Sequence, residues 1–200
     1  MIALIDYRAG NLTSVKKALA AVGADVFVPQ QPADITRADG VIVPGVGHFG
    51  ATRALDGAWV DAIGDHVRRE RPLLGICLGM QWLFESSEEA PEIKGLGVLK
   101  GLCVRLKPPD LKVPHVGWNS LTLTRGAWIT GGVPDGAQVY FTHSYVAPTT
   151  SDCVAVTEHG VAFAAIVQRD HVAGVQFHPE KSGDVGLRVL RNFVFETQRK

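Results

Sequence analysis

Residues 72–84 read Pro72-Leu73-Leu74-Gly75-Ile76-Cys77-Leu78-Gly79-Met80-Gln81-Trp82-Leu83-Phe84. The apolar run 73–76 is too short and too uniform for a half-exposed strand, and helix-forming residues resume at Leu78. The pattern therefore predicts a buried strand that turns sharply into a helix, with Cys77 at the bend. Glycines at 75 and 79 complete a G-x-C-x-G arrangement, in which the missing Cβ atoms let the two backbones pack closely.

A cysteine at such a bend has two interpretations. The free N–H groups and the dipole at a helix N-terminus favour the thiolate, which is the nucleophilic form of cysteine. Cysteine is also among the most buried residue types, so a structural role fits the motif about as well. The choice between the two depends on partner residues elsewhere in the chain.

The composition predicts a cytoplasmic protein of one domain, residues 1–200. The chain has 200 residues and 46% hydrophobic content, enough for a sizeable core. Its 20 basic and 20 acidic residues give no net charge, so no general attraction to nucleic acid or to a membrane surface is expected. Three widely spaced cysteines argue against a disulfide framework and against a zinc knuckle, and no apolar run approaches membrane-spanning length. We therefore expect no metal and no cofactor.

The first ninety residues alternate between apolar strands and amphipathic helices. After the third strand, residues 44–50 read Pro-Gly-Val-Gly-His-Phe-Gly, which is neither a P-loop nor a dinucleotide fingerprint. An ordinary turn and an oxyanion-binding loop both remain open for this stretch. Ligand sites of parallel sheets gather at the carboxyl ends of the strands, where this loop and Cys77 both lie. The expected strands are 2–5, 25–28, 40–43 and 73–76, and the expected helices are 12–22, capped by Asn11, 53–69 and 78–85.

The second half is richer in strands. We therefore expect an α/β fold, an open and mostly parallel twisted sheet flanked by helices, with additional antiparallel strands in the second half. Residues 111–119 suit a structural loop and an exposed binding surface equally well. The expected strands are 97–106, 118–123, 138–141, 153–156, 162–168 and 172–177, followed by a helix over 184–198.

A partner for Cys77 occurs at His178-Pro179-Glu180. The residue before a proline favours extended backbone, so His178 and Glu180 are expected to point to the same side. A histidine that takes the thiol proton while a carboxylate orients it would complete a Cys-His-Glu catalytic triad. A metal site is a weaker interpretation because one H-x-E pair supplies only two ligands. Of the other histidines, we expect His66, His159 and His171 on the surface, and His48, His115 and His143 remain candidates near the site.

Taken together, these motifs resemble the class I glutamine amidotransferases over nearly the whole chain. Within that family they are most similar to the glutaminase subunits of imidazole glycerol phosphate synthase, which share the Pro-His-x-Gly-Trp-Asn stretch at 114–119. One departure is Arg8-Ala9, where the family often has smaller or more flexible residues. The resemblance implies a flavodoxin-like fold. It rests on residues 6–7, 10–11, 44–49, 75–81, 114–119, 140–145 and 176–182.

The resemblance also implies a mechanism. Cys77 would attack the side-chain amide of L-glutamine, His178 would act as general base and then acid, and Glu180 would orient the imidazole. The N–H of Leu78 and one from the Val46–Gly47 peptide would stabilise the oxyanion. By the same resemblance, the ends of the substrate would be held by Gln81, Glu89, Ser144 and Tyr145.

Ammonia released into water becomes unreactive ammonium, so the resemblance implies a docked synthase. The family partner is a separate (β/α)8-barrel cyclase subunit, which forms a heterodimer with the glutaminase and makes imidazole glycerol phosphate for histidine synthesis. The implied docking residues are Asn11, Trp118, Asn119, Tyr140 and Lys181. Three alternatives stay open: the glutaminase subunit of another amidotransferase, a different cysteine hydrolase of this architecture, and a catalytically silent regulatory module.

Overall fold

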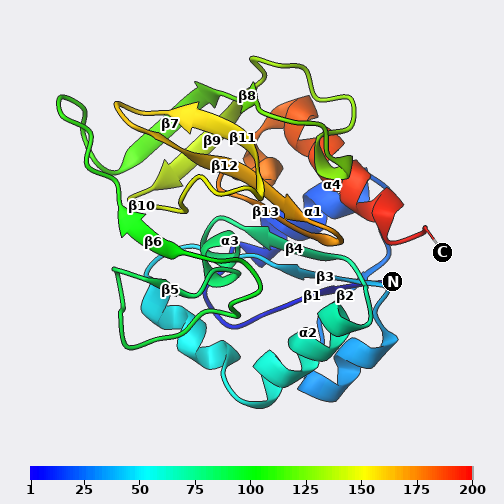
Figure 1. Ribbon diagram of the computed structural model, residues 1–200. Helices are drawn as coiled ribbons and strands as arrows, with labels where there is room; N and C mark the ends of the chain where they lie inside the picture. Colours follow the sequence, from blue (N-terminus) through cyan, green and yellow to red (C-terminus); the bar gives the residue numbers. More distant parts are fainter. Residues whose placement is uncertain (200) are drawn as a thin grey trace.

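The computed structural model describes residues 1–199 and is built around an eight-stranded sheet (Figure 1). The strand order is β2-β1-β3-β4-β13-β12-β11-β8. The first five strands of that order are parallel, and they are short and almost entirely buried apart from edge strand β2. They are β1 (Ile2–Leu4), β2 (Val26–Phe27), β3 (Gly40–Val43), β4 (Leu73–Ile76) and β13 (Val172–Val175).

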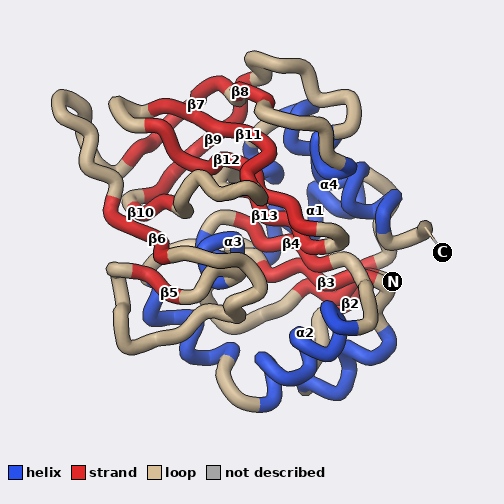
Figure 2. Tube along the Cα trace, viewed as in Figure 1, coloured by secondary structure: helices blue, strands red, loops and turns tan. Residues whose placement is uncertain are grey.

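The other three strands of the sheet run antiparallel, and two smaller sheets lie beside it (Figure 2). The predicted fold class, a mostly parallel sheet with antiparallel strands from the second half, is therefore confirmed. In the main sheet the remaining strands are β12 (Ala162–Arg169), β11 (Cys153–Glu158) and β8 (Thr122–Leu123). The smaller sheets pair β7 (His115–Ser120) with β9 (Gln138–His143), and β6 (Leu102–Arg105) with β5 (Ser86–Ser87) and β10 (Tyr145–Val146).

Helices cover both faces of the parallel strands, and alternating strand residues feed two separate cores. Leu4 and Ile42 pack into the core beneath α1 (Leu12–Ala21) and α4 (Gly183–Glu196). Ala3 and Val41 pack on the opposite face, beneath α2 (Ala58–Arg68) and two 3₁₀ helices, η1 (Pro32–Arg37) and η2 (Phe49–Leu55). This alternation is the period-two pattern of strands that are buried on both faces.

Two predicted helices differ from the structure. The helix predicted over 53–69 is divided, because Gly57 with a φ of +56° interrupts the chain between η2 and α2. The helix predicted over 78–85 is shorter: α3 spans Leu78–Trp82, and a loop then leads to β5. Helix α1 begins as predicted, since the Asn11 side chain accepts a hydrogen bond from the N–H of Ser14 at 3.4 Å.

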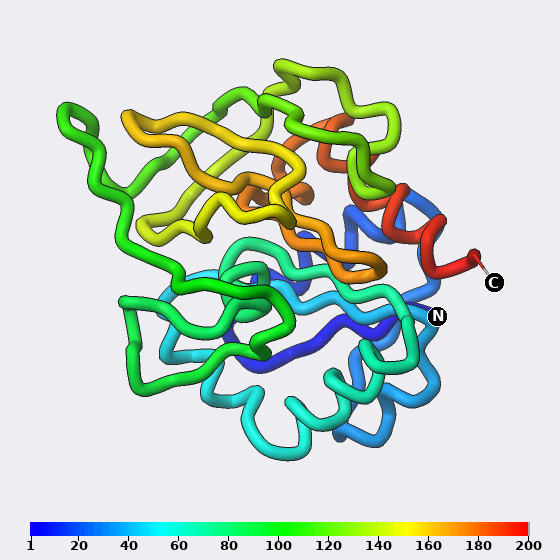
Figure 3. The backbone as a smooth tube through the Cα atoms, in the orientation of Figure 1, coloured from blue at the N-terminus to red at the C-terminus, as the bar shows by residue number. Residues whose placement is uncertain are grey.

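The parallel strands point away from the chain ends. Figure 3 shows both termini on one side of the molecule, where β1 begins, so the carboxyl ends of β3, β4 and β13 lie at the opposite edge. The segments that follow these three strands contain the Pro44–Gly50 loop, Cys77 and His178. Among the described residues, no helix combines the length and the apolar character needed to traverse a bilayer.

Candidate active site

Cys77 occupies the turn between β4 and α3. Its φ is +52°, a left-handed conformation that is uncommon for a residue with a Cβ. The N–H of Cys77 donates to the carbonyl of Val175 at 2.7 Å, which fixes the turn to the neighbouring strand β13. The side chain is 5% exposed, at the N-cap position of α3. The strand–cysteine–helix bend predicted from the sequence is therefore present.

The two flanking glycines allow this bend because no side chain would fit there. A Cβ built on Gly79 would lie 1.8 Å from the carbonyl oxygen of Val43, in strand β3. A Cβ built on Gly75 would lie 2.6 Å from the carbonyl oxygen of Gly79. Helix α3 can therefore rest directly on the sheet backbone, which holds Cys77 at the sheet edge.

His178 and Glu180 follow the adjacent strand β13, and they face each other. His178 Nδ1 lies 2.9 Å from Glu180 Oε1, and both side chains are 2% exposed. Glu180 belongs to a 3₁₀ turn, Pro179–Lys181, instead of the extended backbone that the sequence suggested. The pairing survives because the turn folds the carboxylate back toward the imidazole. The Ser182 hydroxyl donates to the carbonyl of His178 at 2.7 Å and holds this turn in place.

The register of the sheet brings Cys77 and His178 together. Ile76 of β4 pairs with Val175 of β13. Cys77 and His178 therefore follow neighbouring parallel strands at the same edge of the sheet. Burial disfavours a charged imidazole, but Cys77 and Glu180 outweigh it and raise the pKa of His178 to about 10. His178 Nε2 has no hydrogen-bond partner among the described residues, and it is the ring nitrogen left free by Glu180.

Cys77 opens into a cavity of about 220 Å³. Six other residues that the sequence analysis assigned to the site line the same cavity, whereas Val46, His178 and Glu180 do not. His143 also lines it, as do Pro114 and Thr142, which the sequence analysis did not single out. The six assigned residues are Gly47, Leu78, Gln81, Glu89, Ser144 and Tyr145.

Gln176 is a site residue that the sequence analysis missed. It is fully buried, its Nε2 lies 3.5 Å from Cys77 Sγ, and its Oε1 accepts a hydrogen bond from Gln81 at 3.1 Å. Gln81 also donates to the carbonyl of Tyr145 at 2.9 Å, so its amide group is already engaged. The signal was available, because Gln176 precedes His178 by two residues on extended chain and shares its side.

Glu89 links the cavity to the loop after β3. Its Oε2 accepts a hydrogen bond from the N–H of Phe49 at 2.7 Å, at the start of η2. Its carboxylate therefore anchors the end of the Pro44–Gly50 loop and faces the cavity at the same time.

Two backbone N–H groups of this region are engaged elsewhere, whereas the N–H of the Val46–Gly47 peptide belongs to Gly47 and makes no hydrogen bond among the described residues. The N–H of Val46 donates to the carbonyl of Ala9 at 2.5 Å, and the N–H of Leu78 faces the carbonyl of Gly45 at 3.4 Å. Gly47 has a φ of +94°, a backbone conformation that glycine adopts readily and residues with a Cβ rarely adopt. In this arrangement a carbonyl oxygen, and not an N–H, approaches the helix end beside Cys77.

The histidines divide differently from the prediction. His66 was expected on the surface but is 3% exposed, because it continues the buried face of α2 one turn after Ile63 and contacts the carbonyl of Pro72 at 3.1 Å. His159 and His171 are half-buried. His115 and His143 are buried partners, with 3.0 Å between Nδ1 and Nε2.

His48 lies at the exposed cap of η2, where its Nδ1 accepts from the N–H of Gly50, and it does not line the cavity. No cluster of three or more His, Cys, Asp or Glu side chains with metal-binding geometry occurs within residues 1–199.

Three of the five expected docking residues lie together in one surface patch, in which Tyr140 is half-buried and the other two, Trp118 and Lys181, are exposed. Trp118 is 56% exposed and pairs across strands with Tyr140, with 6.1 Å between the ring centroids. The Lys181 ammonium lies 5.6 Å from the centre of the Tyr140 ring. The other two are engaged within the chain, since Asn11 caps α1 and Asn119 donates to the carbonyl of Glu158 at 2.8 Å.

Comparison with known proteins agrees with this geometry. The family model "Glutamine amidotransferase class-I" matches residues 3–197. Two proteins named imidazole glycerol phosphate synthase subunit HisH, from Moorella thermoacetica and Bacillus cytotoxicus, are 48% and 44% identical to this chain. Each alignment spans 196 residues and covers 96% of this chain and 93% of the relative.

Solved structures show the same fold at lower identity. One described as a glutamine amidotransferase superposes with a TM-score of 0.78 at 20% identity, covering 100% of both chains. The PurLQS structure from Thermotoga maritima gives a TM-score of 0.74 at 19% identity, covering 97% of both chains. With the family model spanning nearly all of its length, the chain belongs to the class I glutamine amidotransferases.

Proposed function

We propose that this chain is the glutaminase subunit of an imidazole glycerol phosphate synthase in histidine biosynthesis. The observation that carries the proposal is that Cys77, which opens into a small cavity, meets the buried His178–Glu180 pair. The two HisH relatives, 44% and 48% identical over nearly the whole chain, support the assignment to this synthase. The three cysteines are free, which suits the reducing cytoplasm that we propose as its location.

The proposed reaction converts L-glutamine and water to L-glutamate and ammonia. Cys77 Sγ attacks the carbonyl carbon of the side-chain amide, and its proton passes to His178 Nε2 and then to the leaving ammonia. Water next attacks the glutamyl thioester, again with His178 as the base, and glutamate departs as the thiol is restored. Glu180 holds Nδ1 of the imidazole, so Nε2 is the nitrogen available to exchange protons with the sulfur.

The lining of the cavity fits the two ends of glutamine. Glu89 offers a carboxylate to the substrate ammonium, and the Ser144–Tyr145 segment offers backbone N–H groups to the substrate carboxylate. Gln81 lines the cavity, and Gln176 lies behind it against the sulfur. Because both amides are already hydrogen-bonded, we assign them to positioning the reacting amide group and shaping the cavity.

We propose that the loop conformation described here is a resting state. The oxyanion of the tetrahedral intermediate needs N–H donors, but the N–H of Val46 is bonded to Ala9 and that of Leu78 to Gly45. Rotation of the Gly45–Val46 peptide, which carries both the Gly45 carbonyl and the Val46 N–H, would break both contacts and present the Val46 N–H to the substrate oxygen. A change from 1:99 to 99:1 in favour of that state needs about 5.5 kcal/mol of differential binding, which a docked partner with its ligand can supply.

The proposed partner is a separate (β/α)8-barrel cyclase that receives the ammonia. The Trp118–Tyr140–Lys181 patch is the proposed docking surface, since an exposed tryptophan packed on a half-buried tyrosine beside a cation is typical of binding hot spots. Lys181 directly follows Glu180, so a contact made by its ammonium can bias the catalytic turn. The N–H of His178 donates to the carbonyl of Tyr140 at 2.9 Å, and this bond connects the patch directly to the segment that carries His178.

The test measures glutamine hydrolysis by the purified chain alone, with the cyclase subunit of a HisH-containing synthase, and with that subunit plus its nucleotide ligand. We expect little turnover alone and strong activation in the loaded complex, with none in a Cys77→Ala variant. Activity of Cys77→Ala equal to wild type would refute the mechanism. Full activity of the lone chain would refute the resting loop.

The docking surface is tested separately with Lys181→Ala. We expect weaker assembly and less activation, whereas Lys100→Ala, which removes a lysine whose side chain is 74% exposed, serves as the matched control. Equal behaviour of the two variants would exclude Lys181 from the interface. No turnover under any of these conditions would favour the silent regulatory module.

A further inference from the structure

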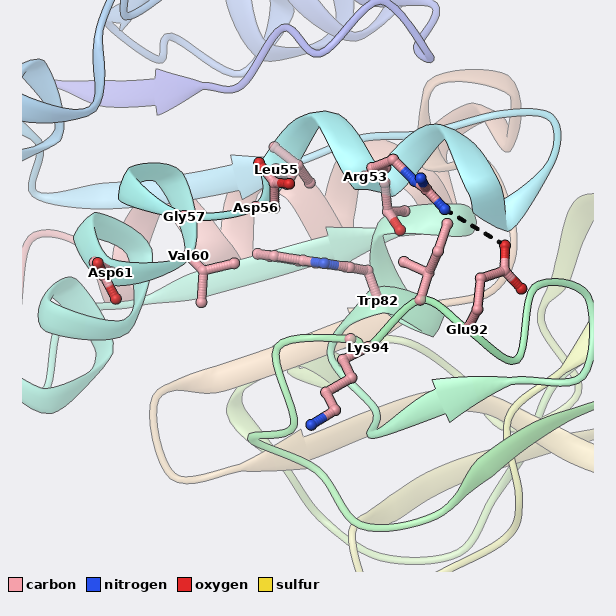
Figure 4. A pocket seen from close by; sticks show the side chains of 12 residues that line it. Arg53, Leu55, Asp56, Gly57, Val60, Asp61, Trp82, Glu92 and Lys94 are labelled. Carbon is pink, nitrogen blue, oxygen red and sulfur yellow. Dashed lines mark ion pairs between the residues drawn. The ribbon is translucent and has the colours of Figure 1, made fainter.

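A second and larger cavity lies beside the site just described (Figure 4). Its volume is about 540 Å³, within the range of about 300–1,000 Å³ typical of small-molecule sites. Its walls come from η2, from the start of α2 and from residues 92–95. Helix α3 separates the two cavities: Leu78 and Gln81 line the first, and Trp82 lines the second.

Trp82 presents an unused hydrogen-bond donor to this cavity. The residue is only 1% exposed, and its indole N–H donates to no acceptor within residues 1–199. The nitrogen itself is not completely enclosed by the protein. By contrast, the indole N–H of Trp128 donates to the carbonyl of Asp170 at 2.8 Å. Figure 4 shows the Trp82 ring lying at the wall of the cavity, between Asp56 and Lys94 and beside Val60. An indole N–H in a largely buried residue normally finds a partner, so this one is available to an acceptor that enters the cavity.

Charges of both signs surround the indole. Figure 4 shows Asp56 on one side of the Trp82 ring and Lys94 on the other, with Asp61 further along the wall. None of these three makes an ion pair with a residue of the range 1–199, whereas Arg53 at the same rim is 3.6 Å from Glu92. Apolar side chains, Leu55 and Val60 among them, complete the walls.

We propose that this cavity binds a small zwitterionic α-amino acid. Its carboxylate accepts the hydrogen bond of the Trp82 indole and faces the Lys94 ammonium, while its ammonium group faces Asp56 and Asp61. Its side chain packs against Leu55 and Val60. An anion alone would leave the two aspartates unmatched, and a simple cation would leave both the indole N–H and Lys94 unmatched, so a molecule with both charges satisfies the lining.

The position of the cavity gives such a ligand access to the reacting site. Helix η2, which forms one wall, continues directly from the Pro44–Gly50 loop, and Glu89 fixes the N–H of Phe49 at its first residue. Residues 89–95 pass from one cavity to the other. An occupant that restrains η2 therefore acts on the loop that carries Val46 and Gly47, without touching Cys77.

The experiment follows the Trp82 indole N–H by ¹⁵N NMR of the full chain. The chain has four tryptophans, so a Trp82→Phe variant assigns the resonance by its loss. The probes are the L-α-amino acids other than glutamine and glutamate, which are excluded because the first cavity is proposed to bind them. Each amino acid that binds is then compared with its amino alcohol, which lacks the carboxylate, and with its N-acetyl derivative, which lacks the ammonium.

We expect at least one amino acid to move the Trp82 resonance saturably at millimolar concentration, and both of its derivatives to bind at least about tenfold more weakly. Asp56→Asn and Lys94→Met change exposed side chains and should each weaken binding by a similar factor, while Ser144→Ala, in the other cavity, should not. The proposal fails if no probe gives a saturable shift. It also fails if a derivative binds as well as its parent, or if the two rim variants retain wild-type affinity.

Discussion

Substitution of Gly79 by alanine should both destabilise the protein and misplace Cys77. The added Cβ would lie 1.8 Å from the carbonyl oxygen of Val43, about 1.6 Å inside the shortest ordinary contact. Val43 is fully buried in the middle of the sheet, so the strain falls mainly on α3. Overpacking of this kind costs about 1–3 kcal/mol, and a displacement near 1 Å at a reacting group costs about 10²-fold in rate.

Urea unfolding at pH 7 and glutaminase assays of the assembled synthase measure these two effects. Gly126→Ala is the matched control, since a Cβ at Gly126 meets no atom within 4 Å and its φ lies outside the left-handed region. We expect Gly126→Ala to remain within about 0.5 kcal/mol of wild type with full activity. If Gly79→Ala behaves like this control in both assays, close contact between α3 and β3 does not position the cysteine.

Three further outcomes are expected. Burial lowers the pKa of His66 to about 4 and that of His143 to about 3, so the unfolded chain binds more protons below pH 6.5. Stability should therefore fall as the pH drops from 6.5 toward 4, by up to about 1.4 kcal/mol per pH unit for each histidine. In urea unfolding measured across this pH range, the free energy of unfolding of His66→Gln should depend less steeply on pH than that of the wild type. Asp152→Ala should cost about 1–3 kcal/mol, because Asp152 accepts two bonds from Arg169 and its side chain is only 11% exposed. The exposed Asp65→Ala should cost under about 0.5 kcal/mol, and equal losses in urea would contradict this ranking. A glutamine analogue with an electrophilic diazoketone should label Cys77 alone, since burial raises the pKa of both Cys103 and Cys153, and peptide mapping that finds either of these labelled would mean that the reactive thiol is misassigned.

The parts of the site that depend on neighbouring residues in the chain could be predicted. The strand, the bend and the helix around Cys77 are encoded within residues 72–84, and the His178–Glu180 pair within three residues. The first survives because missing Cβ atoms at Gly75 and Gly79 allow close packing, and the second because the turn Pro179–Lys181 folds Glu180 back toward His178.

Features that depend on packing between distant segments could not be predicted. Nothing near Val46 in the sequence shows that its N–H meets the carbonyl of Ala9. The pairing of β7 with β9 in a separate sheet could not be predicted either. An alternating pattern of apolar residues predicts a strand but does not say which other strand it pairs with. The burial of His66 and the break at Gly57 had local signals, a helical stripe with Ile63 and a glycine, that the sequence analysis did not weigh.

The pairing of Ile76 with Val175 has a consequence for which parts of the protein can move. Cys77 and His178 are suspended from two interior strands, so the spacing between sulfur and imidazole is maintained by backbone hydrogen bonds that only global unfolding would release. Amide protons of β4 and β13 should therefore be among the slowest to exchange with deuterium, and those of the 44–50 loop among the fastest. Substitutions in the loop can then change the conditions under which the enzyme becomes active, while the spacing between the proposed reacting atoms of Cys77 and His178 stays fixed.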